Sequence, residues 1–124
     1  MNLNGASVRA MAQFYDIFPH EILVVHDELD LAAGDLRLKT AGGHGGHNGL
    51  RDVIAQLHSN EFHRLRIGIG HPGHRDWVTD YVLSKPSIAD KDKINTAIER
   101  ALCEIDLILA GNFAIAMNHL HTEK

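Results

Sequence analysis

The segment between Thr40 and Leu50 is the part of this chain whose residue types and spacing best suit chemistry. It reads Ala-Gly-Gly-His-Gly-Gly-His-Asn-Gly, so five glycines, two histidines and an asparagine occupy nine positions. Residues 35–39 before it are typical of a strand, and the spacing of the apolar residues over 47–58 predicts a helix. The glycines therefore lie at a strand-to-helix junction, where backbone amides can bind an anion or a carbonyl oxygen. Because a simple turn needs no imidazoles or carboxamide, we expect a binding site here.

A second polar segment, 26–30, reads His-Asp-Glu-Leu-Asp and follows a short apolar run over 21–26 that is typical of a buried strand. Sites in α/β proteins gather at the carboxyl ends of strands. A carboxylate at such a place can orient an imidazole and stabilise its charged form. The alternative is that these acidic side chains are simply solvated.

The chain has ten histidines, so a metal site has to be considered. His44 and His47 are three apart, and His71 and His74 repeat that spacing. A zinc site needs three or four converging ligands, and the helical pair that usually supplies two of them is spaced by four. We therefore expect no bound metal. Three other histidines are expected at the surface: His20, His119 and His121.

Charge is unevenly distributed along the chain, although the net charge is only −4. Residues 35–75 carry six basic side chains against three acidic ones, and the segments on either side are acidic. Local patches of this kind matter more than net charge for binding phosphates. The alternative is scattered, solvated charges. The basic residues are Arg37, Lys39, Arg51, Arg64, Arg66 and Arg75.

The remaining pattern predicts an α/β domain over residues 1–124, with a mixed sheet and helices on both of its faces. Helices are expected over 4–17, 47–58, 87–110 and 113–120, and strands over 21–26, 35–39 and 64–70, whereas 78–83 is ambiguous. Three strands are few for so many helices, so we expect the fold to be incomplete at its N-terminus. Cys103 lies in an apolar helical pattern and is expected to be a core residue, which fits a reducing, cytoplasmic compartment. No apolar run is long enough to cross a membrane, and no secretory leader is expected.

The chain resembles bacterial peptidyl-tRNA hydrolases in several segments that keep the order and approximate spacing of that family. The segments are Met-Asn-Leu-Asn-Gly (1–5), His-Asp-Glu-Leu-Asp-Leu (26–31), Gly-Gly-His-Gly-Gly-His-Asn-Gly (42–49), Phe-His-Arg-Leu-Arg-Ile-Gly-Ile-Gly-His-Pro-Gly (62–73) and Val-Leu-Ser-Lys-Pro (82–86). The resemblance implies an enzyme that cleaves the ester between a peptide and the 3′ ribose of tRNA, and so recycles stalled peptidyl-tRNA. It also implies no metal or organic cofactor, no membrane contact, no obligatory protein partner, and a cytoplasmic monomer when full length.

The same resemblance assigns roles to individual residues. Asp27 matches the carboxylate that orients the catalytic imidazole, and Asn2 matches an asparagine near the attacking water. Five residues match the part of the cleft that binds the peptide or the tRNA 3′ end: Met1, Gly45, Gly46, His47 and Asn48. Three match positions associated with tRNA phosphates: Lys39, Arg66 and Arg75.

The chain departs from the family at one important point. The general base of the family is a histidine in a Thr-Arg-His-Asn-like segment, and these 124 residues contain no such segment. His20 lies in a turn and does not replace it. We therefore expect a truncated peptidyl-tRNA hydrolase with weak or no activity. Two alternatives remain: a non-catalytic module that binds the 3′ end of tRNA or another RNA, and a histidine-based metallohydrolase that uses His44 and His47.

Overall fold

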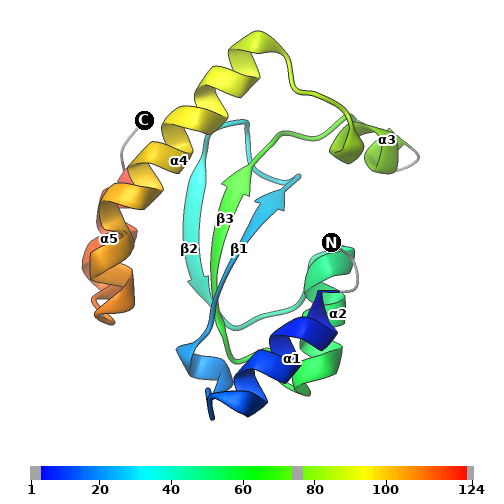
Figure 1. Ribbon diagram of the computed structural model, residues 1–124. Helices are drawn as coiled ribbons and strands as arrows, with labels where there is room; N and C mark the ends of the chain where they lie inside the picture. The colour runs from blue at the N-terminus through cyan, green and yellow to red at the C-terminus, as the bar shows by residue number, and fades with distance from the viewer. Residues whose placement is uncertain (1–3, 74–76, 123–124) are drawn as a thin grey trace. The chain divides into compact units, whose positions relative to one another are not determined.

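The computed structural model describes residues 4–73 and 77–122, and Figure 1 shows their elements in chain order. They are α1 (Gly5–Phe14), the 3-10 helix η1 (Pro19–Glu21), β1 (Leu23–Glu28), β2 (Leu36–Thr40), α2 (Asn48–Leu57), β3 (His63–Gly68), α3 (Val78–Leu83), α4 (Ile88–Leu109) and α5 (Phe113–Thr122). The mixed α/β class expected from the sequence is confirmed. None of the helices in these ranges is both long and apolar enough to cross a membrane.

The three strands form a mixed sheet in the order β1-β3-β2. Hydrogen bonds from His63 N to Ile22 O and from Ile69 N to Glu28 O advance together along the chain, so β1 and β3 are parallel. The bonds from Ala41 N to Phe62 O and from Gly68 N to Asp35 O run in opposite directions, so β2 is antiparallel to β3. The arrows in Figure 1 show the same directions.

The chain divides into two compact units, and the first comprises residues 1–24 and 39–64. Within it α1 and α2 pack side by side (Figure 1), and Gly5 lies at their closest approach. The Gly5 amide donates to Asp52 Oδ2 at 2.7 Å, and a Cβ on Gly5 would lie 2.6 Å from the Asp52 carbonyl oxygen. Asp52 thus satisfies one of the unpaired amides at the start of α1. The buried core of this unit is Leu50, Val53 and Phe62.

The second unit comprises residues 25–38 and 65–124, and its buried apolar side chains come from β2, β3, α4 and α5. Small buried side chains let α4 and α5 approach closely, because Ala97, Ala101 and Ala116 are 6% exposed or less. Arg100 on α4 donates to the Leu120 carbonyl on α5 at 3.0 Å.

Both ends of α4 follow from the local sequence, as predicted. Ser87 is the N-cap, and its hydroxyl accepts from the Asp90 amide at 3.1 Å. Gly111 follows the helix with φ +83°, a conformation in which glycine commonly ends helices. The ambiguous segment 78–83 is the helix α3.

The predicted start of the first strand and the predicted burial of Cys103 are wrong. The first strand begins at Leu23 and not at Glu21, because Pro19 opens a 3-10 turn and the ladder to β3 continues through Glu28. Asp27 and Glu28 therefore lie inside the end of β1 and not after it. Cys103 is exposed, because the buried face of α4 is formed by Ala97, Ala101 and Ile108. The single-domain prediction for 1–124 stays a prediction.

Candidate active site

The glycine-histidine loop connects β2 to α2 within the first unit, as the sequence predicts. Three of its glycines adopt backbone conformations that other residues rarely reach: φ is +106° at Gly42, +57° at Gly45 and +82° at Gly46. A Cβ on Gly42 would also lie 2.9 Å from the amino group of Lys39. Lys39 is exposed at the end of β2, and its amino group therefore lies over the start of the loop.

Both loop histidines use Nδ1 to accept hydrogen bonds from the backbone. His44 Nδ1 accepts from the Gly46 amide at 3.0 Å. His47 Nδ1 accepts from the Leu50 amide at 3.1 Å and is the N-cap of α2. A histidine in this position satisfies an amide of the first helical turn, a role in which serine, threonine, aspartate or asparagine is more common.

These bonds indicate which ring nitrogen of each neutral histidine carries the proton. A nitrogen that accepts from an N–H carries no proton, so the neutral ring carries its proton on Nε2. The lone pair that could take a proton from water is already engaged in the loop. His44 and His47 thus hold the loop in shape, and neither is arranged as a general base.

Arg64 of β3 anchors the start of the loop, a role that the sequence did not indicate. Its Nη1 donates to the Gly43 carbonyl and its Nη2 to the Gly42 carbonyl, each at 2.5 Å, and Nη2 also donates to the Asn60 carbonyl at 3.2 Å. Arg64 is only 2% exposed. It therefore cannot bind a phosphate from solvent, contrary to its inclusion among the basic residues expected to do so. The glycine-rich loop in the sequence could have indicated the role of Arg64, because the backbone carbonyls of such a loop need hydrogen-bond donors when they are buried.

A short hydrogen-bond chain joins the end of β2 to the turn before β1. His63 Nε2 lies 2.9 Å from the His20 carbonyl, which can only accept, so Nε2 carries the proton. His63 Nδ1 then accepts from the Thr40 hydroxyl at 2.8 Å. The side chain of His20 is exposed, as predicted, and stacks on Phe18.

In the second unit, the acidic segment lies at the end of β1. Asp27 is half-buried, and its carbonyl oxygen accepts from His26 Nδ1 at 2.8 Å. Glu28 Oε1 accepts from Arg66 Nε at 2.9 Å, with side chains that are 16% and 26% exposed. Arg66, expected to contact tRNA phosphate, is therefore already paired with a carboxylate, and a phosphate would have to compete with Glu28.

The structure places the remaining predicted residues as follows. Asn48, Gly45 and Gly46 are exposed at the loop and the first turn of α2. Met1, Asn2 and Arg75 lie outside the described residues.

The other two histidines expected at the surface, His119 and His121, lie on α5. His119 is half exposed, as predicted, and its Nδ1 lies 3.0 Å from Glu104 Oε2. The prediction for His121 is wrong, because this side chain is partly buried against β2 and accepts from the Leu38 amide.

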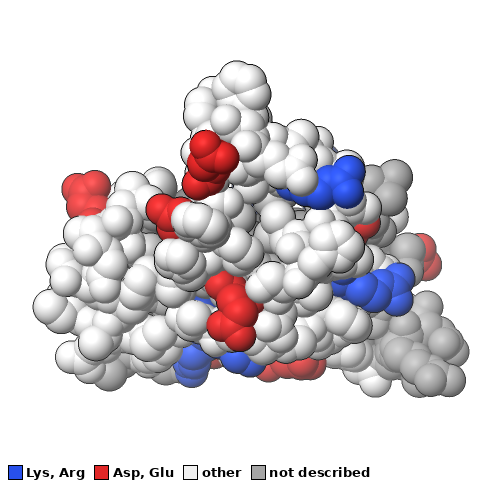
Figure 2. Space-filling model, turned by 90° about the horizontal axis from the view of Figure 1, so that it is seen from below, with Lys and Arg blue, Asp and Glu red and all other residues white. Residues whose placement is uncertain are grey.

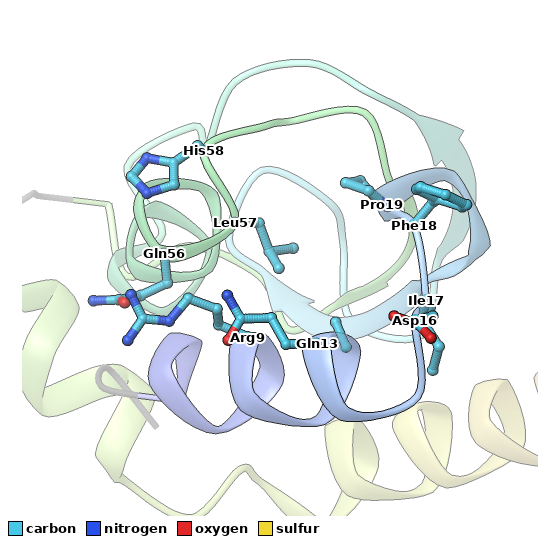
Figure 3. Close-up of a pocket in the computed structure, with 10 residues that line it drawn as sticks. Arg9, Gln13, Asp16, Ile17, Phe18, Pro19, Gln56, Leu57 and His58 are labelled. Atoms are coloured by element: carbon cyan, nitrogen blue, oxygen red, sulfur yellow. The ribbon is translucent and has the colours of Figure 1, made fainter.

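The described residues form a surface hollow but no metal site. No three His, Cys, Asp or Glu side chains of residues 4–73 and 77–122 converge as a metal site. A hollow of about 350 Å³ lies in the first unit, where α1 supplies Arg9 and Gln13 and α2 supplies Gln56 and Leu57 (Figure 3). None of the described residues expected at the active site lines it. On the face seen in Figure 2, the blue basic side chains are dispersed and form no single patch.

Comparison with known proteins decides the family. The family described as "Peptidyl-tRNA hydrolase" matches residues 1–124. The chain belongs to the peptidyl-tRNA hydrolase family. It is similar to peptidyl-tRNA hydrolases of Legionella pneumophila (59% identical over 98% of this chain and 64% of the relative) and Haemophilus influenzae (55%, over 100% and 64%). It is also similar to the crystal structure of peptidyl-tRNA hydrolase from Acinetobacter baumannii, with a TM-score of 0.96 and 47% identity over 100% of this chain and 63% of that one.

The family assignment confirms the resemblance read from the sequence motifs. The chain spans about 64% of the length of the curated relatives that it matches. The expectation of weak or no activity is not borne out by these comparisons.

Proposed function

We propose that this protein hydrolyses the ester bond that joins a peptide, or an N-blocked amino acid, to the 3′ ribose of tRNA. The observation that carries the proposal is the match of the peptidyl-tRNA hydrolase family to the chain from residue 1 to residue 124. The fixed glycine-histidine loop supports it, because the loop presents exposed backbone and a carboxamide beside a helix N-terminus. Such groups stabilise negative charge on an ester oxygen during hydrolysis.

In this proposal the loop binds the junction between peptide and ribose. Gly45 and Gly46 are exposed, so a substrate can approach the backbone there closely. Asn48 is exposed at the first position of α2 and offers both a donor and an acceptor. His47 holds the start of that helix, and the resemblance to the family assigns Met1 to the binding of the peptide or the tRNA 3′ end.

The chemical step transfers a proton from the attacking water. The water oxygen bonds to the ester carbonyl carbon, the bond to the ribose oxygen breaks, and the ribose oxygen takes up a proton. A positioned base contributes typically 10²–10⁴-fold to such a step. Both loop histidines have Nδ1 engaged, so neither is the proposed base. The resemblance to the family assigns that base to the histidine of a Thr-Arg-His-Asn-like segment, which Asp27 orients, with Asn2 close to the water.

The proposed partner is a tRNA that carries a peptidyl group. Lys39 and Arg75 supply positive charge for its phosphates, and Arg66 does so by exchanging Glu28 for phosphate. No membrane contact, metal, organic cofactor or obligatory protein partner is required, and we propose a cytoplasmic monomer.

The test is release of peptide from peptidyl-tRNA by the purified protein and by two matched variants. Asp27→Asn removes the half-buried carboxylate proposed to orient the base, and Asp30→Asn removes an exposed carboxylate three residues later. We expect hydrolysis by the unaltered protein, a fall of at least about 10²-fold in kcat for Asp27→Asn, and no such fall for Asp30→Asn.

Two outcomes contradict the proposal. Salt-sensitive binding of tRNA without peptide release would instead indicate a non-catalytic RNA-binding module. Activity that is removed by a chelator and restored by zinc would instead indicate a metallohydrolase.

A further inference from the structure

Arg64 is a buried cation whose hydrogen-bond partners are backbone carbonyls. Among the described residues its guanidinium makes no ion pair with a carboxylate, and burial lowers its pKa from the ordinary value. A buried charge is costly unless hydrogen bonds compensate it, and a buried polar group of this kind is weak evidence for stability. The position of this side chain therefore needs a reason other than stability.

The geometry around Arg64 is restrictive. Two nitrogens of one planar group bind the carbonyls of consecutive residues, Gly42 and Gly43, in a fork that arginine offers and lysine does not. The guanidinium carbon also lies 4.6 Å from the centroid of the Phe62 ring, which is completely buried. The ring and the carbonyls together leave the guanidinium one orientation.

Arg64 and His47 hold opposite ends of the same loop. Arg64 fixes the loop's start to β3, and the bond from the Leu50 amide to His47 fixes its end to α2. Between these anchors lie Gly45 and Gly46, where an added Cβ would meet nothing within 4 Å. The loop is thus held at its ends and open to solvent in the middle, the arrangement that a binding loop needs.

We propose that Arg64 is a positioning residue for peptidyl-tRNA hydrolysis, which fixes the glycine-histidine loop so that its amides and Asn48 meet the ester. This inference rests on the proposed function. Arg64 touches no substrate, because it is 2% exposed and bonded to the inner side of the loop. Its effect on the reaction passes through the Gly42 and Gly43 carbonyls.

The experiment compares kcat and KM of the unaltered protein with those of Arg64→Met and Arg64→Lys. Arg9→Met is the matched control, because Arg9 is exposed on α1 and lies outside the proposed site. A misplacement of about 1 Å in a binding group can lower the rate by roughly 10²-fold. We expect a loss of that order in kcat/KM for Arg64→Met, an intermediate loss for Arg64→Lys, and none for Arg9→Met.

Two further measurements separate positioning from folding. Amide exchange should accelerate at Gly46 and Leu50 in both Arg64 variants, whereas exchange at Leu38, in the second unit, should stay unchanged. Guanidinium ion at millimolar concentration should restore part of the activity of Arg64→Met, and it should not affect Arg9→Met. Arg64→Lys keeps the charge and serves as the folded variant if Arg64→Met does not fold.

The outcomes distinguish the two proposals. No hydrolysis by the unaltered protein refutes the proposed function. An active protein whose Arg64→Lys variant keeps full kcat/KM, or whose loop amides exchange at the unaltered rate, refutes the positioning role.

Discussion

His121 closes the outer edge of β2 with a bond that exists in one protonation state. Ala41 N and Asp35 O face β3, so by alternation the backbone groups of Leu36 and Leu38 face away from it. The Leu38 amide donates to His121 Nε2 at 2.9 Å. That nitrogen must be unprotonated to accept, and a charged imidazole would break the bond.

The pKa of His121 lies below its ordinary value of 6.5, because burial and then the positive charge of Arg37 disfavour the charged ring. The unfolded chain therefore takes up this proton first as pH falls. Between 6.5 and the lower folded value, the unfolded state holds more protons, and stability falls with falling pH. The contribution of His121 is fully present above about pH 6.5 and is lost below it.

The variant His121→Ala leaves the Leu38 amide without this acceptor. Leu38 is 3% exposed, so water reaches the amide poorly, and the cost of an unpaired buried group is about 1–3 kcal/mol. We expect urea unfolding, followed by circular dichroism, to show this loss at pH 7.5. At pH 5 the gap between variant and unaltered protein should shrink, because the unfolded chain of the unaltered protein then protonates His121, which reduces the stability that this histidine contributes.

The control is His119→Ala, on the same helix, whose half-exposed ring lies 3.0 Å from Glu104 Oε2. Loss of a surface contact of this kind costs about 1 kcal/mol at most. Other charged side chains near the last turn of α5 are Arg37 on β2 and Arg100 on α4. An equal gap for His121→Ala at both pH values would refute the reasoning, since the hydrogen bond would then not depend on protonation.

The remaining predictions concern backbone space and core volume. Gly68→Ala would place a Cβ 2.1 Å from the Ala32 carbonyl oxygen, so we expect a lowered Tm and poor recovery of folded protein, both measured by thermal unfolding. Gly46→Ala should lower the free energy of unfolding by about 1 kcal/mol, because alanine is strained at φ +82°. Gly43→Ala should be neutral in urea unfolding, because Gly43 has open space around it and no positive φ. Equal effects of these two loop variants would contradict the assignment of strain. Phe62→Ala should cost about 3–5 kcal/mol in the same assay, because the ring is fully buried in the core of the first unit.

Regular periodicity predicted most of the elements. The apolar spacing over 87–110 and the stop at Gly111 predicted α4 to within one residue at each end, since both the stripe and the caps are local. The glycine-histidine loop was predicted in the same way, because a strand pattern precedes it and a helix pattern follows it. The first strand was placed two residues early, because an apolar run does not show which residues pair with β3.

The sequence by itself determined that the loop over 41–49 carries polar groups at a helix N-terminus and that the chain resembles peptidyl-tRNA hydrolases. The tertiary structure decided what each neighbouring side chain does. Arg64 and Arg66 are two apart on one strand and look equivalent in the sequence. One is buried against the Gly42 and Gly43 carbonyls, and the other pairs with Glu28. Arg64 and Arg66 differ because their partners lie 21 to 38 residues away in the chain, and a local sequence pattern does not show such distant partners.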